Sequence, residues 1–472
     1  MLRPDPLFEE PQWGAAVTTA EPSRPTPEKA DANPYQSPAA GNGAPARHKG
    51  TNREIFAWAI YDWANSAYST LSITVLTVYI LKDVLPGSRG TLLVGLGLGI
   101  TTFVSALLSP VLGAVADANA SKRRWLAGTA FSGAGACVLM FFTDAQHAWA
   151  MVILYIVSVM GMELSQTFYN AFLPELAEDE RMDRVSSWGY ALGYVGGGLA
   201  LAIVLLLFMF RQQVGLSEIA CKRIGLLLMG LWWGGFSLPT VLVLKDKNMP
   251  AGQPKPVLQA ARVAFHNIGH TLRNIRSYRM LTIFILGFLV YNDGVQTVIS
   301  QASVFATELL GMGMQELVGV VLMIQFIAFP GALAVGWLAE RFGQKIVLMG
   351  CLAVWTMILA LSFLISERWH FWCMAAVVAL VLGGTQSVSR SIMGLMTPPQ
   401  HAGEFFGFFN FSGKATSVFG PSFFSIMLTA TESPHLALAS LLAFFVVGWM
   451  IIAPLNVAEG QRQSRAAEDA AH

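Results

Sequence analysis

Long apolar stretches recur along most of this chain and are separated by short polar segments. A helix needs about 20 mostly apolar residues to cross the hydrocarbon core of a bilayer, and twelve stretches meet that requirement. We expect these spans at 54–81, 91–117, 124–143, 148–173, 186–210, 223–244, 279–303, 315–339, 345–366, 369–396, 404–429 and 434–455. The pattern therefore predicts an all-α membrane protein with twelve transmembrane helices.

Polar segments flank the spans and divide them into two sets of six. The first 50 residues hold nine of the 22 prolines and few apolar residues, a composition that buries too little apolar area to fold. We therefore expect disordered tails over 1–50 and 457–472. The two six-helix bundles then cover 51–244 and 279–456, with a cytoplasmic linker over 245–278.

The linker has a helical pattern of its own. Its apolar residues recur at spacings of three and four, while its basic residues largely occupy other angles: Leu258, Ala261, Phe265, Ile268, Leu272 and Ile275 are the apolar set. That pattern is typical of a basic amphipathic helix lying on a membrane surface. A solvated linker helix is the alternative.

Lysine and arginine lie mainly on one side of the predicted membrane. If the N-terminus is cytoplasmic, the inner segments include Lys122-Arg123-Arg124 and the basic residues of the linker. The outer segments then hold only Lys82, Arg89, Arg211, Lys222, Arg223 and Arg368. Positive charge stays on the cytoplasmic side, so we expect a multi-pass protein of the cell (inner) membrane with both termini in the cytoplasm.

Composition narrows the possible functions. Hydrophobic residues make up 54% of the chain and charged residues 12%, against about 25% charged in soluble domains. The net charge of +1 argues against a nucleic-acid partner. The four cysteines form no metal-ligand pattern, and no phosphate-binding loop, His-Glu-x-x-His or Gly-x-Ser-x-Gly sequence occurs. We expect no metal, no cofactor and no enzymatic activity.

Polar residues occur inside the predicted spans, where they are costly and usually functional. Many lie three or four residues apart and so share a helix face. They are Asp62, Asn65, Tyr68, Glu163, Gln166, Asn170, Asn292, Asp293, Gln296, Gln386, Arg390, Asn410 and Lys414. We interpret this set as a substrate and proton pathway. For any single residue, a structural ion pair between helices is the alternative.

Two of these residues receive specific roles. Glu163 is the first candidate for a proton carrier, because desolvation should favour its protonated form unless Arg390 or Lys414 lies against it. Arg390 is the candidate for holding a substrate carboxylate, since its guanidinium fork binds at two points. A gate ion pair of Arg390 with Asp62 or Glu404 is the alternative.

Glycines recur every four residues in the fifth predicted span, at Gly189, Gly193 and Gly197. Small residues at this spacing let helices approach closely. We interpret them as a packing surface rather than as part of a substrate site.

A short charged motif occurs twice, about half a chain apart, as expected for a duplicated transporter. Each copy places Gly-x-x-Ala-acid at a helix end with basic residues beyond. The pattern resembles the loop motif of the major facilitator superfamily, although Ala120 stands where that family usually has glycine. The resemblance implies a cytoplasmic gate made by Gly113, Asp117, Arg123, Gly336, Glu340 and Arg341. A solvated basic loop is the alternative.

Three further stretches resemble one branch of that superfamily: 61–68, 189–197, and 383–391 followed by Glu404-Phe405-Phe406-Gly407. They are similar to the "unknown major facilitator" family, to which the autophagy-linked vacuolar amino-acid effluxers belong. The resemblance covers about 54–455. It implies the major facilitator fold, two pseudo-symmetric six-helix bundles around a cavity lined chiefly by spans 1, 4, 7 and 10.

Together these features predict a secondary transporter of a small polar solute. We expect a monomer that exports amino acids or related metabolites by alternating access, with protons as the coupling ion. The alternatives are an uptake symporter for another small solute, or a transporter-like sensor or scaffold that carries no flux. An intramembrane enzyme is a distant third possibility.

Overall fold

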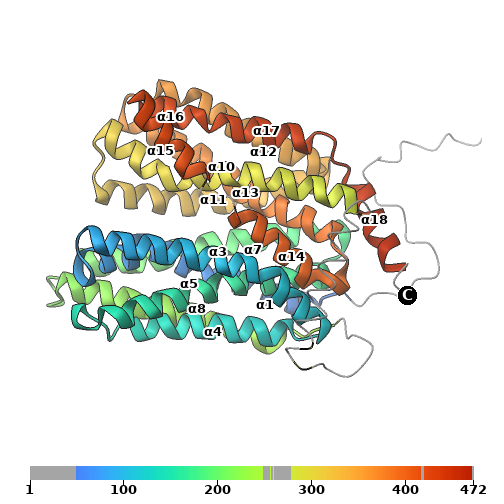
Figure 1. The fold of residues 1–472 in the computed structure, drawn as a ribbon, viewed down its shortest axis with the longest axis horizontal. Helices are drawn as coiled ribbons and strands as arrows, with labels where there is room; N and C mark the ends of the chain where they lie inside the picture. The colour runs from blue at the N-terminus through green and yellow to red at the C-terminus, as the bar shows by residue number, and fades with distance from the viewer. Residues whose placement is uncertain (1–48, 248–255, 257–258, 260–277, 416–418, 470–472) are drawn as a thin grey trace, which may run out of the picture. The chain divides into compact units, whose positions relative to one another are not determined.

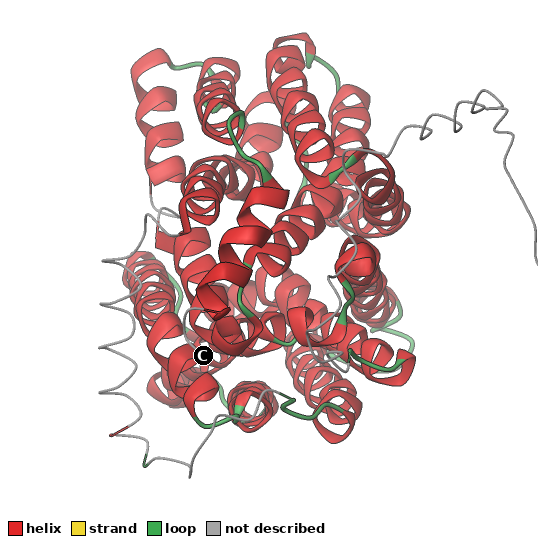
Figure 2. Ribbon diagram, turned by 90° about the vertical axis from the view of Figure 1, so that its right-hand side faces the viewer, coloured by secondary structure: helices red, strands yellow, loops and turns green. Residues whose placement is uncertain are grey.

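The computed structural model describes residues 49–247, 256, 259, 278–415 and 419–469. All of them belong to one compact unit, Ala40–His472. Figure 2 shows that the described part of the chain consists of helices joined by loops, without strands. The prediction of an all-α fold is confirmed. The tail predicted over 1–50 and the amphipathic helix predicted within 245–278 lie almost wholly outside the described residues.

The helices of the N-terminal half follow the predicted order. They are α1 (Asn52–Leu71), continued by η1 (Ser72–Leu76), α2 (Thr77–Tyr79) and η2 (Ile80–Val84); α3 (Ser88–Ala118); α4 (Lys122–Met140); α5 (Ala148–Ala171) with α6 (Leu173–Leu176); α7 (Met182–Met209); and α8 (Glu218–Val243).

The C-terminal half repeats this arrangement. Its helices are α10 (Arg279–Leu310), α11 (Met314–Phe342), α12 (Gln344–Leu361), α13 (Arg368–Met396), α14 (Ala402–Ala415), α15 (Phe419–Thr431), α16 (Pro434–Ser440), α17 (Leu442–Ile452) and α18 (Val457–Asp469). Among the described residues, ten helical segments are long and apolar enough to cross a membrane. Helix α4 and the α14–α15 pair lie at the other two predicted positions, so the described helices are consistent with twelve spans.

Several helix ends follow directly from the local sequence. Thr51 and Glu54 form a capping box at the start of α1, in which each side chain accepts the other residue's backbone N–H. Ser217 accepts the N–H of Ala220 at the start of α8, at 3.1 Å. Gly343, between α11 and α12, has a φ of 90°, which favours glycine. These ends let the chain reverse direction within a few residues.

Each half has its own hydrophobic core. In Figure 1 the helices α1 to α8 form the lower group, and most helices from α10 to α17 form the upper group. The N-terminal core includes the fully buried Trp58 and Trp233, and the C-terminal core includes Trp355 and Phe445. The surface between the two cores, which we call the seam, is where the polar residues gather.

The seam is closed at one end of the helices. We define the basic end as the end that carries Lys122, Arg184 and Arg341, where α4 and α7 begin and α11 ends. In Figure 1 this end is on the right, on the side where α18 lies. Helix α14 packs tightly against α3 there, and α11 packs against α7. Among the described residues, α15 has no comparable packing against α3. Helix α3 therefore contacts the predicted eleventh span only through α14, the part of that span at the basic end.

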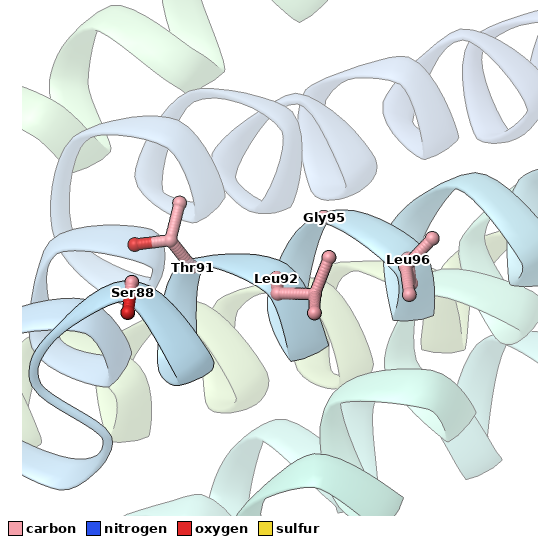
Figure 3. Close-up of a pocket in the computed structure, with 5 residues that line it drawn as sticks. All are labelled: Ser88, Thr91, Leu92, Gly95 and Leu96. Atoms are coloured by element: carbon pink, nitrogen blue, oxygen red, sulfur yellow. The ribbon is translucent and has the colours of Figure 1, made fainter.

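The exposed outer part of α3 borders a shallow cavity of about 640 Å3, lined by Ser88, Thr91, Leu92, Gly95 and Leu96 (Figure 3). All five residues belong to one helix. A solute site needs several convergent polar groups, which this wall does not offer. The cavity therefore does not mark the functional site.

Helix α18 crosses the basic end, so the prediction of a disordered tail over 457–472 is wrong for Val457–Asp469. Gln463 accepts the N–H of Met280 at 3.1 Å, and Arg465 pairs with Asp179 at 2.8 Å. The segment is polar overall, yet Ser464 is buried and Val457 packs against both cores. Its tertiary contacts, rather than its composition, make it a helix.

Candidate functional site

Arg390 of α13 reaches across the seam into the N-terminal half. Its Nη1 donates to Asp62 Oδ2 at 2.9 Å and to Asn170 Oδ1 at 3.3 Å. Its Nε donates to the Ser186 hydroxyl at 3.0 Å, and its Nη2 donates to the Ser186 carbonyl at 2.7 Å. The arginine is only 1% exposed. A guanidinium stays charged when buried, so Asp62 is its necessary counter-charge.

Three aromatic rings surround the same guanidinium, and we call Trp58, Tyr169 and Tyr190 the aromatic cage. The Arg390 Cζ lies 4.8, 5.5 and 4.2 Å from their respective ring centroids. Such distances are typical of cation–π contacts. The hydroxyl of Tyr169 also donates to Asp62 Oδ2 at 2.7 Å. Cage and carboxylate together form a socket for a cation, contributed entirely by α1, α5 and α7.

Gly189 makes this arrangement possible. A Cβ at Gly189 would lie 2.6 Å from Asp62 Oδ2 and 2.7 Å from Arg390 Nη2. At Gly193, one turn along α7, a Cβ would lie 2.7 Å from Ser66 Oγ. The glycines do pack closely against α1, and Gly189 also leaves the space that the ion pair occupies.

A second ion pair crosses the seam between α5 and α14. Lys414 Nζ lies 3.0 Å from Glu163 Oε1. Asn410 donates to the carbonyl of Glu163 at 3.0 Å and to the hydroxyls of Ser109 and Thr167, each at 3.1 Å. Glu163 therefore has a cation beside it in this structure, and that cation is Lys414, one of the two partners that the sequence allowed.

Asp293 of α10 is buried without such a cation. It is 2% exposed, and neither of its oxygens hydrogen-bonds to a described side chain. It faces Gly420 at the start of α15, where a Cβ would lie 3.2 Å from its Oδ1. The preceding Asn292 donates to the carbonyl of Gly413 at 3.1 Å. Of the three predicted intramembrane acids, Asp293 alone lacks a basic partner in the described part of the chain.

The first copy of the charged motif holds α3 to α14. The carboxylate of Asp117 accepts the N–H groups of Gly403 at 3.0 Å and Glu404 at 2.9 Å, and so caps the start of α14 where a negative charge is favourable. Lys122 pairs with Glu175 and lies 3.8 Å from Asp117. A Cβ at Gly113 would lie 2.0 Å from the carbonyl oxygen of Gly403, so the backbones meet directly.

The second copy holds α11 to α7. Arg184 donates to Glu340 at 2.7 Å, and a Cβ at Gly336 would lie 2.0 Å from Ser187 Oγ. Asp183, which is not among the residues predicted from the sequence, accepts from Gln344 at 2.7 Å and from Ser391 at 2.5 Å. Its position beside Arg184, after the fourth predicted span, was the feature of the sequence that could have identified it.

The remaining motif residues do not bridge the halves. Arg341 lies over the rings of Trp337 and Phe342, at 5.5 and 5.7 Å. Arg123 forms no ion pair across the seam among the described residues. Just beyond α8, burial raises the pKa of the Asp246 carboxyl above its usual value.

Other predicted pathway residues surround these pairs without a shared centre. Tyr68 hydrogen-bonds to Ser158 at 3.1 Å, and Gln386 accepts from Tyr194 at 3.2 Å. Asn65 is buried, and its amide nitrogen has no partner in the part of the chain that the structure describes. Gln166 and Gln296 are partly buried and make no side-chain hydrogen bond to described residues. The structure thus gathers the predicted residues into two ion-paired groups, at Arg390 and at Glu163, and leaves Asp293 separate.

Comparisons with known proteins agree with this architecture. A family model described as "Vacuole effluxer Atg22 like" matches residues 91–465. The uncharacterized MFS-type transporter YxiO of Bacillus subtilis is 30% identical over 404 residues, which are 84% of this chain and 93% of YxiO. Autophagy-related protein 22-1 of Aspergillus niger is 27% identical over 60% of this chain, and the match spans about half of that protein, 48%.

Solved structures show the same fold. The Escherichia coli fucose:proton symporter FucP aligns with a TM-score of 0.64 at 14% identity, covering 86% of this chain and 98% of FucP. A bacterial homologue of the iron transporter ferroportin, in an outward-facing state, aligns with a TM-score of 0.63 at 15% identity, covering 85% and 98%. The chain therefore belongs to the Atg22-like family of major facilitator superfamily transporters.

Proposed function

We propose that this chain is a secondary active transporter that exports small polar solutes, among them amino acids, by alternating access. The observation that carries the proposal is the buried Asp62–Arg390 pair, which joins the two halves through charged side chains. Opening a path at the basic end requires Arg390 to leave its socket. The pair therefore acts as the gate at that end.

The distribution of contacts supports this role. Polar contacts that hold the seam at or near the basic end include those of Asp117 with α14, Arg184 with Glu340, and Asp62 with Arg390. The lysine and arginine distribution favours a cytoplasmic basic end. On this orientation the gate is closed toward the cytoplasm, and the solute site is open to the outside or occluded.

Energetics explain why the gate would respond to a ligand. Leaving one charge of a buried pair without its partner costs about 3–5 kcal/mol. Separating Asp62 from Arg390 therefore needs a compensating interaction from water, a proton or the solute. A ligand shifts a conformational equilibrium only as far as its affinities for the two states differ. This gate gives the solute different affinities for the closed and the open state.

Proton coupling is the second part of the proposal, and Asp293 is the residue we assign to it. Asp62 pairs with Arg390 and Glu163 pairs with Lys414, whereas Asp293 faces the start of α15 without a described cation. A buried carboxylate without a counter-charge favours its protonated form. Glu163 remains the competing candidate in any state that separates it from Lys414.

The test is solute exchange by the full chain in liposomes, with a mixture of labelled amino acids. We expect saturable counterflow in wild type and in Arg211→Gln, a matched loss of an exposed arginine. Arg390→Lys should largely retain solute affinity, because a gate needs the charge while a carboxylate clamp needs the two-point fork. Loss of affinity in Arg390→Lys would favour the clamp. Saturable binding with no exchange would replace the transporter by a solute sensor.

A further inference from the structure

We infer that the socket now filled by Arg390 is itself a binding site for an organic cation, an ammonium or guanidinium group carried by the transported solute. The inference rests on the proposed opening of the basic end. It narrows the substrate class, because it requires the solute to bear a positively charged nitrogen group.

The socket has the chemistry of a cation site. Its floor is the Asp62 carboxylate, and its walls are the faces of Trp58, Tyr169 and Tyr190. Aromatic faces beside a carboxylate are the arrangement with which proteins recognise alkylammonium groups. Ser186 and Asn170 add hydrogen-bond acceptors for N–H groups.

All of these groups belong to the N-terminal half, and only the cation comes from the other half. The socket is also held together without Arg390. Trp58 stacks on Tyr169 at 4.6 Å between ring centroids and donates its Nε1–H to the Tyr169 carbonyl at 2.9 Å. Tyr169 in turn donates to Asp62 at 2.7 Å. When the halves separate, the socket is left preformed and negatively charged.

An empty socket of this kind is unfavourable, because a poorly hydrated carboxylate needs a counter-charge. A proton on Asp62 would satisfy the charge but would leave the three ring faces and the Ser186 carbonyl unused. An ammonium or guanidinium group uses all of them, as Arg390 does now. Arg390 and the solute cation therefore compete for one site, so that bound solute holds the basic end open and its departure lets the gate close.

Removal of Arg390 tests the socket directly. In full-length Arg390→Ala we expect methylguanidinium to raise the midpoint of thermal unfolding by about 2–4 °C at concentrations well above its Kd. The neutral isostere methylurea should give no rise, and wild type, in which Arg390 competes for the socket, should respond less to methylguanidinium than Arg390→Ala. Adding Asp62→Asn or Trp58→Leu to Arg390→Ala should abolish the stabilisation by methylguanidinium. The control Arg211→Ala, made in the wild-type chain, should not show this stabilisation. Equal responses to methylguanidinium and methylurea in Arg390→Ala would overturn the inference.

A second measurement keeps the test decisive if Arg390→Ala does not fold. Ser387 is 1% exposed, and its backbone carbonyl accepts a hydrogen bond from the Ser186 hydroxyl across the seam at 2.7 Å, so a thiol at this position reports opening of the basic end. In a Ser387→Cys chain without the exposed Cys373, propylammonium should increase labelling by a membrane-impermeant thiol reagent at least severalfold, and propanol should not.

The outcomes separate the two proposals. Labelling that occurs but does not respond to propylammonium contradicts the cation site and leaves alternating access intact. A reporter that stays unlabelled with every solute contradicts both. Labelling that rises with propylammonium and falls back when Trp58→Leu is added supports the cation site over a socket that serves structure alone.

Discussion

Arg390 of α13 and Asp62 of α1 are 328 positions apart in the chain, yet their side chains meet at 2.9 Å across the seam. The contact joins two halves whose hydrophobic cores are largely separate. Because both side chains are buried, the pair is held only while the basic end is closed.

Breaking the pair from one side should destabilise the closed state strongly. In Asp62→Asn, Arg390 stays buried without its counter-charge, at an expected cost of about 3–5 kcal/mol. The double variant Asp62→Asn/Arg390→Gln should be less destabilised than the sum of the two single variants. Thermal unfolding of the purified chains measures this. Simple additivity would show that the two charges do not interact.

Gly189→Ala should displace the ion pair without removing either charge. The new methyl would lie 2.6 Å from the Asp62 carboxylate and 2.7 Å from the guanidinium, and overpacking of this kind typically costs about 1–3 kcal/mol. The matched control is Gly135→Ala on α4, where an added Cβ meets no atom within 4 Å. We expect a lower unfolding midpoint for Gly189→Ala only. Equal midpoints would mean that the pair can shift to make room.

Asp293→Asn should uncouple transport from the proton gradient. The variant keeps the size of the side chain but cannot gain and lose a proton, so transport driven by a pH gradient should disappear while counterflow exchange continues. Glu163→Gln is the comparison. If Glu163→Gln uncouples transport and Asp293→Asn does not, the proton carrier is Glu163 after all.

Asp117→Asn should weaken the closed basic end, because a charged cap at the start of α14 is lost. Such a charge in a partly buried position contributes up to about 2 kcal/mol. We expect faster thiol labelling of Ser387→Cys in this background. Asp144→Asn, at an exposed carboxylate far from the seam, serves as control and should leave the labelling rate unchanged.

Much of the fold could be predicted from the sequence, because span length and hydropathy depend on local composition. Helix α18 was missed because its order depends on contacts with Met280 and Asp179, which local composition does not reveal. The chemically important residues Asp62, Glu163, Asp293 and Arg390 stood out because charges are rare inside apolar spans.

Their pairing could not be predicted. The sequence left Asp62 and Glu404 as alternative partners of Arg390, and it left Arg390 and Lys414 as alternative partners of Glu163. The aromatic cage was also missed, because Trp58, Tyr169 and Tyr190 lie on three different helices and each is an ordinary residue of a membrane helix. Only the packing of α1, α5 and α7 turns them into walls of one socket.

The central claim is that transport requires the seam to open at the basic end. Ser187 and Ser387 offer the most direct test, since their hydroxyl oxygens lie 3.2 Å apart across it. Cysteines at both positions, in a chain without Cys373, should form a disulfide on oxidation. We predict that oxidation stops exchange in liposomes and that reduction restores it, while either single cysteine variant is unaffected. Undiminished exchange by fully cross-linked protein would contradict the claim.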